Sequence, residues 1–150
     1  MNLFEDEAVK LYIQNAIVDG LKFSEKLEKE DIKKILERTV KELESHPNSP
    51  IFSREGPSKE KDDIYSVLVE DVQANIIMSI VYQPGSMHFN MLTDMEYLSP
   101  QDKSIIFHSV LNAVGVVMDS GLAGNVIPAN QDLVLITEQE RTIEDCWVMP

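Results

Sequence analysis

Apolar residues in the first 44 positions recur with the period of an α-helix. Over residues 30–44 they are spaced three and four apart, which places them on one face of a helix, at Ile32, Ile35, Leu36, Val40 and Leu43. A less regular pattern over residues 4–19 predicts an earlier helix, and Gly20 is a suitable residue to end it. The pattern therefore predicts two N-terminal helices, each with one buried face.

Residues 45–63 interrupt this periodicity. The segment SHPNSPIFSREGPSKEKDD contains three prolines, a glycine and charges of both signs, a composition typical of a flexible connector. The 44 residues before it are too few to form a hydrophobic core alone. We therefore expect one domain over residues 1–150, in which the helical segment of residues 1–44 packs on the sheet and helix core of residues 64–150.

From residue 64 onward the pattern changes to that of β-strands. IYSVLVE is rich in β-branched and aromatic residues, and residues 72–82 alternate strictly between two faces. Pro84 and Gly85 then predict a type II turn, after which GSMHFNMLTDM returns as the next strand. A two-residue turn sets a register in which one face of the hairpin is apolar, with pairs Tyr82 and Met87, Ile80 and Phe89, and Met78 and Met91.

A long helix is predicted from Ser99 to Asp119. Ser99 is a good N-cap, and Pro100 suits the first helical position. Polar residues form only a narrow stripe on it, so the helix should be buried on more than one side. The sheet covers one side, and the other must be covered by the N-terminal helices or by a second copy of the chain. The second alternative predicts a homodimer through residues 99–119.

Beyond Gly124 the segments NVIP and DLVLIT predict two short strands, and Thr137-Glu138-Gln139-Glu140 is a capping box that predicts a short final helix. The expected fold class is therefore α+β. It comprises two N-terminal helices, an antiparallel sheet built on a central hairpin, one long buried helix, two further short strands and a short C-terminal helix.

Charge narrows the range of functions. The net charge is −13, and residues 64–150 carry eleven acidic residues against only Lys103 and Arg141. Nucleic acids and anionic membranes are bound through clustered cations, so we expect neither as a partner. An acidic surface suits a basic protein partner or simply keeps the chain soluble.

The same sequence predicts a cytoplasmic location. The single cysteine, Cys146, excludes an internal disulfide and suits a reducing compartment. The N-terminal stretch MNLFEDEAVKL is acidic where a secretory signal is basic, and no apolar run reaches the roughly 18 residues of a membrane span.

No reaction is indicated by the polar residues. Ser79 is diagonal to His88 across the hairpin, but Asp94 lies about 20 Å along the strand and cannot complete a triad. The histidines have no metal-ligand spacing, and neither an EF-hand nor a phosphate loop is present. We predict no catalytic residue, no metal and no cofactor.

Two hypotheses follow. The first is a non-enzymatic interaction module of the chaperone, immunity or inhibitor type, which uses acidic and apolar surface of its C-terminal half. Its candidate partner-binding residues are Ile77, Val81, His88, Asn90, Leu92, Asp94 and Glu96. The alternative is a small-molecule-binding or enzymatic domain, with a pocket between the sheet and the 99–119 helix reached by His88, His108 and Asn112. In size, acidity and helix–strand–helix order the chain resembles the small dimeric chaperones of type III secretion, from which its doubled N-terminal helices depart.

Overall fold

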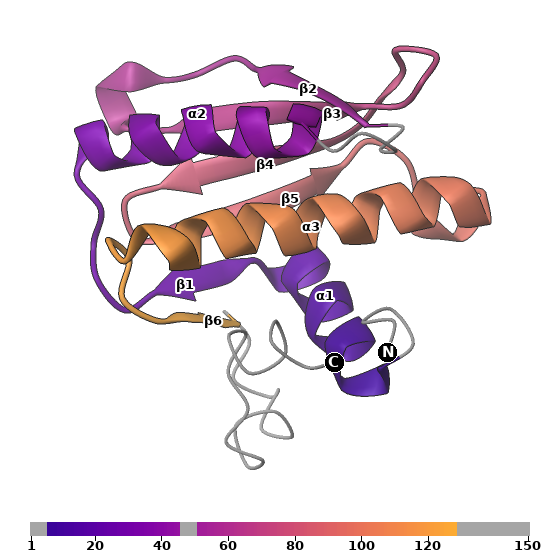
Figure 1. Cartoon of the computed structure of the whole chain (residues 1–150), viewed down its shortest axis with the longest axis horizontal. Coiled ribbons are helices and arrows are strands. Elements are labelled where there is room, and N and C mark those ends of the chain that lie inside the picture. Colours follow the sequence, from indigo (N-terminus) through magenta and orange to yellow (C-terminus); the bar gives the residue numbers. More distant parts are fainter. Residues whose placement is uncertain (1–5, 46–50, 129–150) are drawn as a thin grey trace.

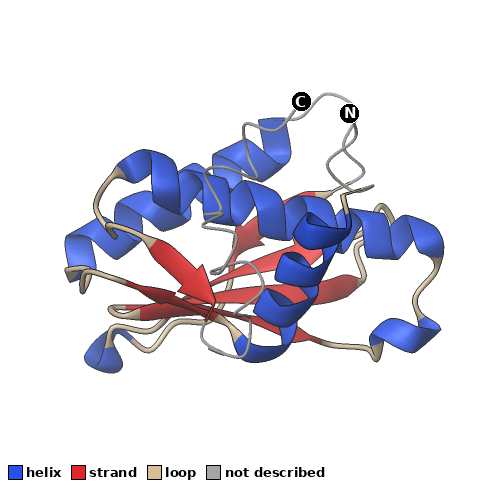
Figure 2. Cartoon of the chain, turned by 90° about the horizontal axis from the view of Figure 1, so that it is seen from below, coloured by secondary structure: helices blue, strands red, loops and turns tan. Residues whose placement is uncertain are grey.

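The computed structural model describes residues 6–45 and 51–128 and shows a mixed fold of helices and one antiparallel sheet. Figure 2 shows two long helices, α2 and α3, on the same side of the sheet, and Figure 1 shows α1 near the β1 end of the sheet. The α+β class is therefore confirmed. The helices are α1 (Glu7–Asp19), α2 (Lys29–Ser45) and α3 (Pro100–Ser120), with two short 3-10 helices, η2 (Glu60–Asp62) and η3 (Met95–Tyr97).

Six strands form the sheet in the order β2-β3-β4-β5-β1-β6, and each neighbouring pair is antiparallel. Their bounds are β1 (Leu21–Phe23), β2 (Phe52–Glu55), β3 (Tyr65–Glu70), β4 (Ile76–Gln83), β5 (Ser86–Met91) and β6 (Val126–Pro128). The expected second strand DLVLIT and the C-terminal helix lie outside the described residues.

Local sequence signals set the ends of α1 and α3. The Asp6 carboxylate accepts hydrogen bonds from the backbone N–H groups of Ala8 and Val9, so it caps α1. Ser99 accepts the N–H of Asp102 at 3.1 Å in the same way, one residue before Pro100 begins α3. The predicted beginning of the long helix is confirmed.

The central hairpin has the predicted register. Met78 pairs with Met91, Ile80 with Phe89, and Tyr82 with Met87. These side chains lie on the face that packs against the helices, where all except Met91 are buried and Met91 is half-buried. The type II turn, however, is wrong, because Gly85 does not have the positive φ that this turn requires at its third residue.

The predicted strand over residues 72–82 begins too early. Residues 72–75 form a turn in which the Asp71 carboxylate accepts the N–H groups of Gln73 and Asn75, both at 2.9 Å. These hydrogen bonds, the Asn75 N–H foremost, lower the pKa of Asp71. An aspartate that bonds the following backbone competes with strand pairing, so β4 begins only at Ile76 and Val72 is exposed.

Some of the segment 45–63, predicted as a flexible connector, belongs to the sheet. β2 pairs with β3 along all four of its residues, and the Ser53 hydroxyl donates to the carbonyl of Val40 at 3.3 Å. The strand also packs beside α2 (Figure 1). Pairing with β3 and packing beside α2 hold this segment as a strand, although its composition is typical of a connector.

The long helix α3 is covered by its own chain. Its buried side chains are spread around most of its circumference, as predicted. The sheet lies on one side of it, α2 runs along a second and α1 contacts a third. Of the two alternatives for covering α3, the structure therefore shows the N-terminal helices, and the burial of α3 gives no argument for a homodimer.

A buried hydrogen bond links α2 to the sheet. The Thr39 hydroxyl donates to the carbonyl of Ile35 at 2.8 Å, so it accepts the proton of the Tyr82 hydroxyl, also at 2.8 Å. Burial raises the pKa of Tyr82 above its usual value of 10.0, and the hydrogen bond to Thr39 offsets only a fraction of this rise. The fold thus requires a protonated Tyr82.

Alkaline pH is therefore expected to weaken the fold through Tyr82. Its pKa is raised in the folded state, so the stabilisation is complete below about pH 10 and is lost as pH rises further, by about 1.4 kcal/mol per pH unit. Urea unfolding at about pH 9 and about pH 11 measures this loss. The variant Tyr82→Phe should show a smaller decrease, and equal decreases in both proteins would contradict the assignment.

Candidate functional site

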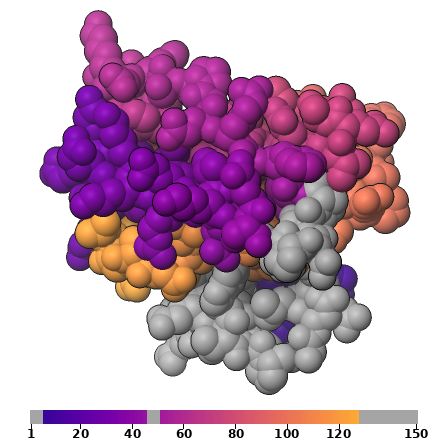
Figure 3. Space-filling view, turned by 45° about the horizontal axis from the view of Figure 1, so that its top comes forward, coloured from indigo at the N-terminus to yellow at the C-terminus, as the bar shows by residue number. Residues whose placement is uncertain are grey.

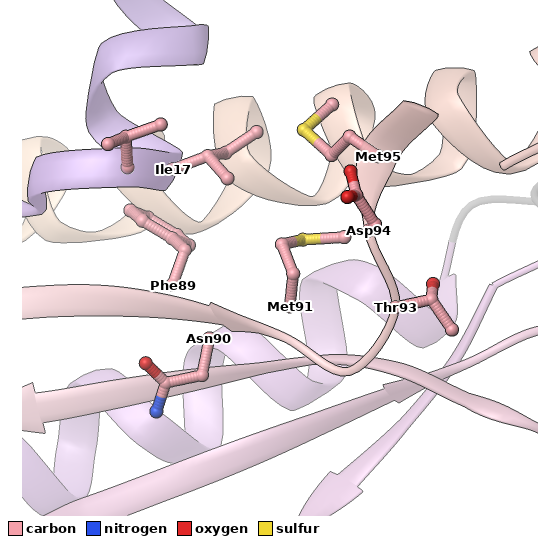
Figure 4. Close-up of a pocket in the computed structure, with 8 residues that line it drawn as sticks. Ile17, Phe89, Asn90, Met91, Thr93, Asp94 and Met95 are labelled. Carbon is pink, nitrogen blue, oxygen red and sulfur yellow. The ribbon is translucent and has the colours of Figure 1, made fainter. Parts of the chain in front are cut away.

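An open groove of about 630 Å³ lies between the C-terminal end of α1 and the end of β5. It is mainly apolar, and Figure 4 shows the side chains of Ile17, Phe89, Met91 and Met95 directed toward one another around it. Its lining residues are Ile17, Val18, Phe89, Asn90, Met91, Thr93, Asp94 and Met95.

The groove exists because β1 is short. β1 pairs with β5 only at Ser86 and Met87, so the remainder of β5 borders α1 instead of another strand. A helix and a strand side by side leave a gap at the surface that the groove occupies. Phe89 and Ile17 form its buried floor, whereas Val18 is 78% exposed at its side.

Two methionines make the apolar wall adaptable. Met91 ends β5 and Met95 begins η3, and both are half-buried against the core. A methionine side chain is unbranched and polarisable, so it fits apolar partners of different shapes at little cost. Tyr97, which is 84% exposed, and Leu92, which is 55% exposed, extend apolar surface around the same loop.

The rim of the groove is acidic. Asp94 lines it, and its carboxylate accepts the N–H of Glu96 at 3.0 Å, which fixes the start of η3. Glu96 is exposed immediately after it. No lysine or arginine lines the groove, so these carboxylates face solvent without a cation among the lining residues. A basic group on a partner would be attracted to this rim.

The structure brings together only some of the predicted partner-binding residues. Asp94 lines the groove, while Leu92 and Glu96 are exposed in the loop that borders it. Asn90 also borders the groove, but its side chain points away from the apolar side chains around it (Figure 4), because Asn90 pairs with Ser79 on the other face of the sheet. By strand alternation, the other three residues lie on the sheet face opposite the helices: Ile77, Val81 and His88. Of these, Ile77 is only 5% exposed, so it offers almost no surface to a partner, contrary to the prediction.

His88 has a packing role that the sequence did not reveal. Its ring lies against Gly20 at the end of α1, so close that a Cβ built on Gly20 would be 2.5 Å from its Nδ1 atom. Its Nε2 atom is 3.1 Å from the hydroxyl of Ser86. The ring therefore packs where α1 joins β1, and its hydroxyl partner is Ser86 and not Ser79.

The alternative pocket of His88, His108 and Asn112 is not assembled. His88 points away from the helices, because its neighbours Met87 and Phe89 occupy the helix-covered face. His108 and Asn112 are on α3, on the other side of the sheet from His88. The three side chains therefore do not converge on one ligand.

The contribution of α1 to the groove was not predicted from the sequence. The buried residues of α1 are Val9, Tyr12, Ile13, Ala16 and Ile17. Val18 is apolar but falls outside this buried stripe. An apolar residue beside the buried face of a helix indicates exposed apolar surface, and this signal was available in the sequence. What the sequence could not give is the distance in space between Val18 and Met95.

Within the described ranges, no group of three histidine, cysteine, aspartate or glutamate side chains is arranged to hold a metal ion. Over the same residues, no helix combines the length and the apolar character that crossing a membrane requires.

Comparison with family models, curated proteins and solved structures gives no match. The function of the groove is therefore inferred from the polarity and charge of its lining residues.

Proposed function

We propose that the protein is a non-enzymatic cytoplasmic interaction module whose groove docks an apolar segment of a basic partner protein. The observation that carries the proposal is an open apolar groove whose described lining residues include the exposed carboxylate of Asp94 and no lysine or arginine. An exposed apolar surface ringed by charge is typical of protein–protein contact sites.

Charge complementarity defines the occupant. The carboxylate of Asp94, which lines the groove, and that of its exposed neighbour Glu96 attract lysine or arginine residues that flank an apolar stretch. A second copy of this chain is a poor occupant, because a protein of net charge −13 would bring further negative charge to an acidic rim. The partner is therefore a different protein with a basic, amphipathic segment.

A designed peptide tests this chemistry directly. We expect a labelled peptide of about twelve residues, with leucines spaced for one helical face and lysines elsewhere, to bind with a Kd of about 10 μM. Fluorescence polarisation measures the affinity. Two control peptides, one with each leucine changed to serine and one with each lysine changed to glutamate, should not bind.

Two protein variants locate the binding. Val18→Ser removes exposed apolar surface, and Asp94→Asn removes charge but keeps an oxygen that can cap η3. Each should weaken binding about fivefold or more. Val72→Ser is the matched control, since Val72 is 62% exposed in the turn before β4. Absence of binding, or equal weakening by all three variants, would refute the groove as the docking site.

A further inference from the structure

One backbone edge of β5 lies along the groove without a paired strand. β5 pairs with β4 over its whole length, whereas β1 pairs with its other edge only at Ser86 and Met87. Beyond Met87 this second edge is bordered by α1 in place of a strand. A sheet edge without a strand presents N–H and C=O groups that another extended chain can bind.

The direction of these backbone groups follows from two hydrogen bonds. The N–H of Leu92 donates to the carbonyl of Ile77 in β4 at 3.3 Å, and the carbonyl of Gly85 accepts an N–H of β1 at 2.9 Å. Even-numbered residues therefore face β4 and odd-numbered residues face β1, because an antiparallel strand alternates between its two edges. Phe89 and Met91 accordingly direct their N–H and C=O groups away from β4.

These backbone groups have no partner on that side. Among the described residues, no backbone hydrogen bond joins Phe89 or Met91 to α1 or to a further strand. Both residues line the groove. A backbone group in apolar surroundings without a partner costs free energy comparable with a lost hydrogen bond. The groove therefore offers hydrogen-bonding backbone as well as apolar side chains.

We propose that the segment bound in the groove is an added strand, hydrogen-bonded to β5 at Phe89 and Met91. This inference rests on the proposed function of the groove and states how the partner binds there. In strand addition, backbone hydrogen bonds supply affinity and alternate side chains supply specificity. The added strand continues the line of β1, which occupies the same edge of β5 at Ser86 and Met87.

Alternation in the added strand defines the sequence of the partner. Phe89 faces the helix-covered side of the sheet and Asn90 faces the other side (Figure 4). Every second side chain of the added strand therefore enters the groove between Ile17 and Met95, where an apolar residue fits. The residues between them stay near solvent, where Asp94 attracts a lysine or arginine.

The far end of the groove has room for the segment to continue. Thr93 and Asp94 line that end, and both are exposed. Figure 3 shows the chain between β5 and α3, coloured orange-pink, at the surface on the right of the view. The partner segment is therefore an extended stretch of alternating apolar and basic residues.

The pattern of a peptide separates strand addition from helical docking. The comparison uses the leucine–lysine peptide with helical spacing and a peptide of the same composition in which leucines alternate with lysines. A peptide of about twelve residues has little stable helix in water, so both can bind as extended chains. Only the alternating peptide then places its leucines on one face, and fluorescence polarisation should show it to bind about tenfold tighter.

Backbone methylation tests the hydrogen bonds themselves. Two versions of the alternating peptide carry N-methyl groups, one on its central leucines and the other on its central lysines. In an added strand only alternate N–H groups face β5, so one version should lose about tenfold or more in affinity. The other should bind within about twofold of the unmethylated peptide. The two versions have the same charge and apolar content, so each is the matched control of the other.

Met91→Pro blocks the proposed edge from the side of the protein. It removes one N–H, and proline is tolerated in a strand where the N–H makes no bond within the sheet, as at Met91 among the described residues. Met91→Ala, which removes only the side chain, is the matched control. Met91→Pro should weaken the alternating peptide about fivefold more than Met91→Ala does, and urea unfolding checks that both variants are folded.

Three results would overturn the added strand. These are equal binding of the alternating and helically spaced peptides, equal losses from the two methylated versions, and equal effects of Met91→Pro and Met91→Ala. If Val18→Ser still weakened peptide binding in such a case, the groove would remain the docking site and only the mode of binding would be wrong. Absence of binding by both unmethylated peptides would instead refute docking in the groove, and the added strand with it.

Discussion

Replacement of Gly20 by alanine is expected to lower the free energy of unfolding by about 3 kcal/mol. Gly20 has φ 81° and ψ −177°, a backbone conformation that is essentially restricted to glycine. An added Cβ would also lie 2.5 Å from Nδ1 of His88 and 3.0 Å from the carbonyl oxygen of Met87. Both the backbone and its surroundings therefore oppose a side chain at the junction of α1 and β1.

Gly85→Ala is the matched control for this measurement. Gly85 does not have a positive φ, and no atom lies within 4 Å of a Cβ placed there. Urea unfolding should show it unchanged or more stable by about 0.5 kcal/mol, because alanine reduces the entropy of the unfolded chain. A Gly20→Ala variant as stable as Gly85→Ala would contradict the described junction.

The two causes at Gly20 can be separated. In a His88→Ala background the contact with the imidazole ring is absent, but the restricted φ and the Met87 carbonyl remain. Gly20→Ala should then cost less than in the unmodified protein while it still destabilises. Equal costs in both backgrounds would mean that the imidazole ring does not contribute, and that the restricted φ and the Met87 carbonyl exclude alanine.

The long elements could be predicted because their signals are local. The N-cap Ser99 and Pro100 mark where α3 begins within four residues of sequence. The hairpin register follows from two strands that are close in sequence and from a pattern that a slip of one residue would invert. In these cases the information lies within the element itself.

The short strands β1 and β2 could not be predicted, because their signals are not local. β1 has three residues and is held by β5 and β6, which are far along the chain. β2 has four residues and is held by the next strand, β3, and by packing beside α2. Tertiary contacts decide such short segments more than their composition does. At Asp71 a local contact overruled the predicted strand. Alternation of apolar and polar residues predicted a strand from residue 72, but the Asp71 carboxylate accepts backbone hydrogen bonds that form a turn there.

The candidate sites depend still more on distant contacts. Asn90 and Asp94 were predicted as partner-binding residues from the polar face of the hairpin, but the groove they border needs Val18, which is more than 70 positions earlier in the sequence. Burial of a polar atom is equally dependent on distant contacts, since the buried hydroxyl of Tyr65 lacks a partner among the described residues. No sequence pattern distinguishes that hydroxyl from the one of Tyr82, which has a partner.

A pair of adjacent substitutions tests the arrangement of the sheet faces. Ile80→Ala is expected to cost about 2–5 kcal/mol, because Ile80 is completely buried under the helices between Val67 and Phe89. Val81→Ala should cost about 1 kcal/mol or less, because Val81 is half-buried on the face without an α-helix in the described chain. Urea unfolding with equal m-values measures both.

The ratio of the two costs carries information that neither value gives alone. Ile80 and Val81 share a strand and similar shapes, so strand propensity affects them alike and the difference reports burial. A cost at Val81 close to that at Ile80 would mean that this face is also covered in solution, and a partner surface there would be excluded. A small cost leaves Val81 and His88 next to solvent, where their substitution can be tested for effects on binding without loss of the fold.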